Sequence, residues 1–176
     1  MRGSRIIHWS ITAAVLIALS LIPSLGKPSV QNRSKQGGQS GGGFKEALAS
    51  VDAAQLELQK GRPAAFKALW SRADDVTLSG GFGGTIEKGW EQVSRRLDWV
   101  GTQFSEGSNT IERLVANESG DLAYVVQIEH IRFVVPGKKQ ESTRDYRVTM
   151  VFRRESEGWR IVHRQADSQM TKQSPQ

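Results

Sequence analysis

Two aspartates and one histidine near predicted strand ends are the side chains of this sequence best suited to acid-base chemistry. They are Asp74, His163 and Asp167. A carboxylate beside an imidazole can accept and return a proton near neutral pH, so an Asp-His couple is a candidate catalytic pair. Asp75 follows Asp74 directly, and adjacent strand residues point apart, so these two carboxylates cannot share one substrate. A structural role for His163 stays open, because lone strand histidines more often pack than catalyse.

The sequence provides no recognisable metal, thiol or phosphate site. It contains no cysteine, which excludes disulfides, thiolate metal sites and cysteine nucleophiles. Its three histidines, at positions 8, 130 and 163, lack the spacing of metal ligands. The glycine-rich stretch 79–84 is not followed by the Gly-Lys-Ser/Thr of a phosphate loop. We therefore expect no metal and no other cofactor.

The stretch 145–167, DYRVTMVFRRESEGWRIVHRQAD, predicts the hairpin that would position two of the three candidates. Two strands rich in β-branched and aromatic residues flank a short turn at 155–158. Strict alternation sets Trp159, Ile161 and His163 of the second strand against Arg160, Val162 and Arg164. A change of one residue in the loop would move each of these side chains to the opposite face.

Apolar residues at intervals of three and four predict helices over 44–60 and 87–104, with a shorter helix from Pro63 to Trp70 between them. Further strands are predicted over 76–79, 110–117 and 122–135, separated by glycine- and proline-containing turns. Helices followed by an antiparallel meander indicate an α+β domain.

The predicted strand from Leu122 onward is apolar on both faces, whereas a sheet with one face in water should alternate cleanly. Helices can cover one face, and a second copy of the chain can cover the other, which predicts a homodimer through the sheet. Polar residues interrupt the apolar pattern. On a concave face they would line a small-molecule pocket, in which Glu129 and Arg147 could pair. The alternative is that they face water and no pocket exists. The candidate pocket residues are Trp70, Trp90, Gln127, Glu129, Arg147 and Thr149.

The hairpin segments YRVTMVFRRE and GWRIVHR resemble the C-terminal strands of SnoaL-like domains, which belong to the nuclear-transport-factor-2-like superfamily that includes ketosteroid isomerases. The resemblance covers residues 44–167. It implies a curved antiparallel sheet, a cone-shaped half-barrel, wrapped around N-terminal helices, with a ligand or active site on its concave face. The isomerase base and its two oxyanion donors correspond to Gly80, Ala54 and Met150, which cannot perform those roles. Isomerase chemistry is therefore not carried over.

Most of the net charge of +6 lies before the predicted domain. Of 24 Lys and Arg residues, five precede Phe44 and no acidic residue does, leaving 19 bases against 18 acids from there on. A nucleic-acid-binding protein would carry its basic surface on the folded part, so we expect no nucleic-acid partner.

The N-terminus has the pattern of an export signal. Arg2 and Arg5 precede a largely apolar run over 6–22, and Ser24-Leu25-Gly26 offers a small-x-small cleavage site, so residues 1–26 are predicted to be a signal peptide. The run is also long enough for a retained membrane anchor, the only reading with a membrane partner. A cleaved signal peptide predicts a secreted or periplasmic protein and a retained anchor a membrane-anchored one, and either places the domain outside the cytoplasm. Residues 27–43 are predicted to be a Gly/Ser-rich linker, 44–168 the domain and 169–176 a disordered tail.

Two functions follow from these observations. The favoured one is binding of a small, mostly apolar molecule without chemistry. The alternative is a SnoaL-like isomerase, cyclase or hydratase with a non-standard acid-base set around Asp74, His163 and Asp167. An acidic or imidazole side chain inside the cavity would favour the enzyme.

Overall fold

The computed structural model describes residues 43–168. The predicted signal peptide over 1–26, nearly all of the linker and the tail over 169–176 lie outside the described residues. Within 43–168, no helix has the length and apolar character needed to span a bilayer.

The described chain forms three helices and one six-stranded sheet, and the helices predicted at 44–60 and 87–104 are confirmed with shorter bounds. The sheet order is β2-β1-β6-β5-β4-β3. All neighbouring strands are antiparallel except β1 and β6, so the sheet is mixed rather than purely antiparallel. The elements are α1 Phe44–Gln59, α2 Ala64–Ala68, β1 Thr77–Ser79, β2 Glu87–Lys88, α3 Trp90–Gly101, β3 Ser105–Ser119, β4 Leu122–Val134, β5 Glu141–Glu155 and β6 Gly158–Asp167.

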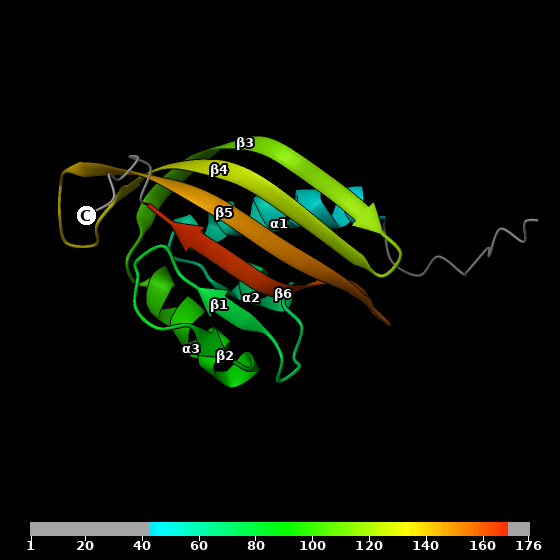
Figure 1. Cartoon of the computed structure of the whole chain (residues 1–176). Helices are drawn as coiled ribbons and strands as arrows, with labels where there is room; N and C mark the ends of the chain where they lie inside the picture. The colour runs from blue at the N-terminus through cyan, green and yellow to red at the C-terminus, as the bar shows by residue number, and fades with distance from the viewer. Residues whose placement is uncertain (1–42, 169–176) are drawn as a thin grey trace, which may run out of the picture. The chain divides into compact units, whose positions relative to one another are not determined.

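The sheet curves, and the helices lie on its concave side. Figure 1 shows α1 running behind β3, β4 and β5, while α3 lies beside the short strands β1 and β2. Leu48 and Val51 of α1 and Val93 and Leu97 of α3 are buried in the core, as their three- and four-residue spacing predicted. The domain is therefore an open α+β half-barrel whose core lies between the helices and the concave face.

Register decides which strand residues face this core. Gln127 of β4 pairs with Val148 of β5, and Glu129 pairs with Tyr146. Directly opposed residues share a face, so the concave side carries the odd-numbered residues of this part of β4 and the even-numbered residues of β5. In β6 the register shifts where Val151 and Phe152 pair with His163 and Ile161, leaving Val162 as an extra residue.

That β-bulge at Val162 reverses the alternation halfway along β6. Ile161 faces the core, and beyond the bulge Arg164 and Ala166 face the same side, opposite Met150 and Val148. Strict alternation had separated Ile161 from Arg164, so that prediction is wrong beyond the bulge. The consequence is an arginine on the concave face.

Gly107 lets β3 approach the end of α1. A Cβ at this position would lie 2.3 Å from the backbone oxygen of Gln59 and 2.6 Å from its Cβ. No side chain fits there without moving the helix, so the glycine fixes the distance between β3 and the last turn of α1.

We predict that Gly107→Ala lowers the free energy of unfolding by roughly 1–3 kcal/mol, because overpacking moves backbone rather than a flexible side chain. Urea denaturation would measure the change. The exposed neighbour Ser108→Ala serves as the control, with a change within about 0.5 kcal/mol. Equal stability of the two variants would contradict the close contact.

Candidate functional site

A small cavity of about 50 Å³ lies between α1, α3 and the concave face of the sheet. Its walls are mostly aliphatic and aromatic, with Phe66, Leu97, Phe104 and Ile131 among them. Four of its lining residues carry polar side chains, and they come from α1, β5 and β6. They are Gln55, Gln59, Tyr146 and Arg164.

Gln55 and Gln59 are four residues apart on α1, so their side chains lie on the same side of the helix. Both are buried, with 2% and 1% of their surface exposed. Neither the oxygen nor the nitrogen of either amide has a hydrogen-bond partner among the described residues. A buried amide without partners costs free energy, so two of them at one cavity require an explanation. The amide atoms are themselves sealed from the cavity, whose exposed surface is apolar, so they become available to a ligand only when the cavity opens.

The Tyr146 hydroxyl is the third buried polar group at the cavity, with 3% of the residue exposed. It does not meet hydrogen-bond geometry with a described residue, although the nearby Arg144 guanidinium interacts with it electrostatically. Burial raises the pKa of Tyr146, and the Arg144 charge only partly opposes that rise. The hydroxyl therefore keeps its proton at neutral pH and can donate a hydrogen bond. Gly81 passes so close that a Cβ there would lie 2.3 Å from the Tyr146 ring.

A polar network lies beneath the cavity. Glu129 is fully buried, and Arg164 donates two hydrogen bonds to its carboxylate at 3.1 and 2.8 Å. The Gln127 amide donates to Glu129 at 2.7 Å and accepts from Arg113 at 3.1 Å. Arg113 in turn donates to Asp52 of α1 at 2.7 Å. This floor network joins α1, β3, β4 and β6, and it satisfies the buried carboxylate.

The predicted pairing of Glu129 with Arg147 is wrong. Arg147 donates to Asp167 at 3.1 and 2.5 Å and lies on the convex face, because it is opposite Ile128 rather than Glu129. Thr149 is opposite Val126 on that same face. Gln127 and Glu129 face the core as expected, but Arg147 and Thr149 do not line the cavity.

The three candidate catalytic residues do not meet at the cavity. His163 pairs across from Val151 on the convex side, where its Nδ1 lies 2.8 Å from the Thr77 hydroxyl, and burial lowers its pKa. Asp167 is bound by Arg147, and Asp74 is exposed. Of the described residues that line the cavity, none has a carboxylate or an imidazole. Within 43–168, no cluster of His, Asp and Glu could hold a metal ion.

The two tryptophans predicted for the pocket have other surroundings. Trp70 is buried with 1% exposed, packs edge-on against Phe66 at 6.4 Å and forms a bridge to Ile161. Trp90 lies under the Arg72 guanidinium, 3.6 Å from the ring centre. Both residues stabilise the segment between α2 and α3 rather than line the cavity.

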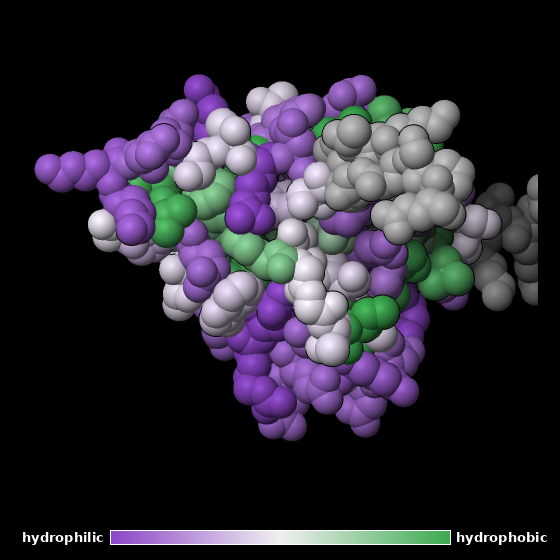
Figure 2. Space-filling view, turned by 60° about the vertical axis from the view of Figure 1, so that its left-hand side comes forward, coloured by the Kyte–Doolittle hydropathy of each residue, from purple (hydrophilic) through white to green (hydrophobic). Residues whose placement is uncertain are grey.

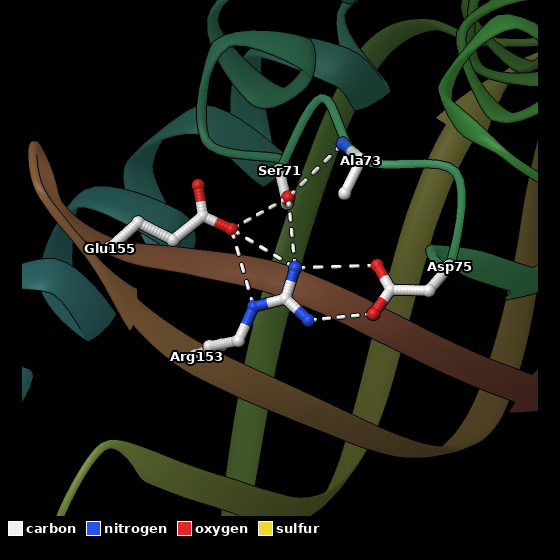
Figure 3. Close-up of polar contacts among 5 residues, drawn as sticks. All are labelled: Ser71, Ala73, Asp75, Arg153 and Glu155. Carbon is white, nitrogen blue, oxygen red and sulfur yellow. Dashed lines mark hydrogen bonds and ion pairs between the residues drawn. The ribbon is translucent and has the colours of Figure 1, made fainter.

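A second polar cluster fixes the loop that follows α2. Figure 3 shows the Arg153 guanidinium between the carboxylates of Asp75 and Glu155, with Ser71 beside it. Arg153 donates to Asp75 at 2.7 Å and to Glu155 at 3.1 Å, and Ser71 donates to Glu155 at 2.7 Å. The hydrogen bond from Arg153 lowers the pKa of Asp75. Arg153 bridges the two carboxylates, so the cluster anchors the loop to β5.

A family model for the SnoaL-like domain matches residues 48–170 of the sequence. The chain belongs to the SnoaL-like domain family. No curated protein matches it significantly. The cavity and its floor network are thus features of a SnoaL-like domain.

Solved structures confirm the fold of this SnoaL-like domain at low sequence identity. An NTF2-like superfamily protein from Salmonella enterica serovar Typhimurium is 18% identical, with a TM-score of 0.62 over 74% of this chain and 96% of the other. A candidate dehydratase of the NTF2-like family from Streptomyces avermitilis is also 18% identical, with a TM-score of 0.59 over 72% and 99%. A candidate calcium/calmodulin-dependent kinase II association domain from Thiobacillus denitrificans is 18% identical, with a TM-score of 0.58 over 70% of this chain and 93% of the other. Roles this different show that the fold alone does not determine function.

Sequence reasoning missed four residues of the SnoaL-like cavity, and two of them left a signal. Gln55 and Gln59 are polar residues on the apolar side of a helix whose other inward positions are aliphatic or aromatic. Tyr146 stands at an alternating position of an apolar-rich strand, which indicates burial but does not show that its hydroxyl lacks a partner. Arg164 was assigned to the wrong face, because no residue type marks the bulge at Val162.

We predict opposite effects from the same substitution at two equally buried glutamines. Gln127→Met removes hydrogen bonds to buried charged groups and should cost about 1–3 kcal/mol of unfolding free energy. Gln55→Met removes no hydrogen bond to the protein. Its free energy of unfolding should therefore lie within about 0.5 kcal/mol of the wild-type value or above it. Urea denaturation of both variants is the measurement. A large loss in Gln55→Met would show that the amide has a structural role.

The pairing of Glu129 can be tested by double-mutant cycles. Glu129→Gln alone leaves Arg164 unpaired and should cost about 3–5 kcal/mol. Adding Arg164→Met should be non-additive by about 1–3 kcal/mol, while adding Arg147→Met should be additive within about 0.5 kcal/mol. Strong coupling to Arg147 instead would contradict the register of β4 and β5.

Proposed function

We propose that this SnoaL-like domain binds a small, mostly apolar molecule in the concave cavity, without chemistry. The unpartnered amides of Gln55 and Gln59 carry the proposal, together with the Tyr146 hydroxyl. Apolar walls with a few convergent polar groups are typical of ligand sites. A ligand with a hydrogen-bonding group would satisfy amides that otherwise reduce stability.

The cavity has to enlarge to take such a ligand, because ligand pockets usually measure about 300–1,000 Å³. Phe82 separates it from an open groove of about 550 Å³ lined by Trp99, Phe133, Val135 and Arg144. Phe82 belongs to a loop whose Gly83 and Gly84 have φ values of 73° and 98°. Figure 2 views the domain from the side of the β4–β5 turn, where apolar patches lie among polar residues. We infer that displacement of Phe82 joins cavity and groove into one pocket.

Binding is favoured over catalysis by the cavity lining. The enzymatic alternative needs an acid or base at the ligand, whereas Asp74, His163 and Asp167 lie elsewhere and the described lining supplies neither. The buried carboxylate of the floor network, Glu129, is already bound by Arg164 and Gln127.

The proposal also includes a homodimer and an exported domain. The convex side exposes large apolar residues, with Leu122 56%, Val115 38% and Tyr124 41% exposed. Exposed apolar area of this kind commonly forms protein interfaces, and a second copy through the sheet would cover it. Export rests on the sequence pattern of residues 1–26.

A thermal-shift screen of the 27–176 protein against steroids, polyketides and fatty acids tests the ligand proposal. We expect at least one class to raise the Tm, and Gln55→Met to weaken its binding about tenfold, the effect of one lost hydrogen bond of about 1.4 kcal/mol. Gln92→Met, an exposed change on α3, is the control. Hits that bind Gln55→Met and the wild type equally would contradict the assignment of the site.

Light scattering after size exclusion tests the dimer. We expect the wild type to have twice the chain mass and Tyr124→Glu to be monomeric, because a buried unpaired carboxylate opposes association. Ile86→Glu changes an apolar residue that is 63% exposed but lies in the β1–β2 loop, so this control should stay dimeric. A monomeric wild type at micromolar concentration would exclude the proposed interface.

A further inference from the structure

The mouth of the cavity carries a cation without a counterion. Arg144 lies two residues before Tyr146 on β5, and it is opposite Ile131, so both side chains belong to the concave face. Its guanidinium lies 4.7 Å from the centre of the Phe82 ring, at the boundary between cavity and groove. No described carboxylate forms an ion pair with it.

The other arginines at this site are already engaged. Arg164 donates to the Glu129 carboxylate with both terminal nitrogens of its guanidinium. Arg96 donates to the Gly83 carbonyl at 2.7 Å and lies 3.9 Å from Glu87. The groove that Arg144 lines contains no acidic residue among the described ones. The available positive charge at the mouth is therefore that of Arg144.

The Tyr146 hydroxyl is a second hydrogen-bond donor on the same face as this charge. Arg144 and Tyr146 are two residues apart on β5, opposite Ile131 and Glu129, and the hydroxyl forms no hydrogen bond of good geometry with a described residue. A guanidinium offers two parallel N–H groups to an acid, and a protonated phenol offers a third donor. An anionic oxygen at this point would satisfy both side chains at once.

We propose that the ligand is an amphipathic anion, with an apolar body in the cavity and groove and one acid group held by Arg144 and Tyr146. This inference rests on the proposed binding function and adds the chemical class of the ligand. The amides of Gln55 and Gln59 then contact the buried end of the molecule, and the acid group stays at the mouth. A neutral analogue of the same shape loses the charge-assisted hydrogen bonds.

Two fluorescent probes with one skeleton separate the acid from the apolar body. They are 8-anilinonaphthalene-1-sulfonate, an anion, and N-phenyl-1-naphthylamine, which lacks the sulfonate. Titration of the 27–176 protein should give a Kd at least tenfold lower for the anion. Arg144→Gln should raise the Kd of the anionic probe at least tenfold and that of the neutral probe less than twofold. Tyr146→Phe should raise the Kd of the anionic probe by a smaller factor and leave that of the neutral probe unchanged.

Arg147→Gln is the matched control, because it removes the same charge from the same strand on the convex face. It should change neither Kd by more than twofold. Equal affinities of the two probes for the wild type, or equal losses in Arg144→Gln, would overturn the inference and leave the proposed binding function intact. If neither probe binds the wild type, both the inferred ligand class and the proposed binding function are contradicted. Loss of the anionic probe in Tyr124→Lys would place it on the convex face and overturn the assignment.

Discussion

A fully buried carboxylate is the constraint on which the concave face depends. Glu129 has no contact with solvent, so its charge requires a partner and further hydrogen bonds inside the domain. Arg164 supplies the charge, but only because the bulge at Val162 turns it toward the core. Gln127, Arg113 and Asp52 extend the network to α1. One compensated charge thereby fixes the position of the helix that carries the cavity amides.

Much of the fold could be predicted from local pattern. Three- and four-residue spacing identified the helices, and alternation with turn residues identified the strands of the meander, since both periods follow from backbone geometry. The resemblance of the final hairpin to SnoaL-like domains was confirmed. Alternation alone could not give the pairing of Gln127 with Val148, because register depends on the loop between strands. Arg147 and Thr149 were consequently grouped with the wrong face.

The candidate site could be predicted less well, because its residues are distinguished by the absence of hydrogen-bond partners among the described residues. Gln55 and Gln59 differ from ordinary core residues only in having no partner, and that property appears only when every neighbour is in place. Asp74, His163 and Asp167 were candidates because their side chains are suited to acid-base chemistry, yet they lie outside the cavity. The unpaired amides reduce the stability of the domain, and such a cost is typical of residues that a binding site requires.

The central claim is that the side-chain amides of α1 contact the ligand directly. NMR spectra of ¹⁵N-labelled protein resolve the amide groups of glutamine side chains, so each can be followed during titration with N-phenyl-1-naphthylamine. We predict that the signals of Gln55 and Gln59 shift and saturate together, while that of Gln127, held in the floor network, stays in place. Unchanged Gln55 and Gln59 signals, with shifts confined to residues around Tyr124 on the convex face, would contradict the account.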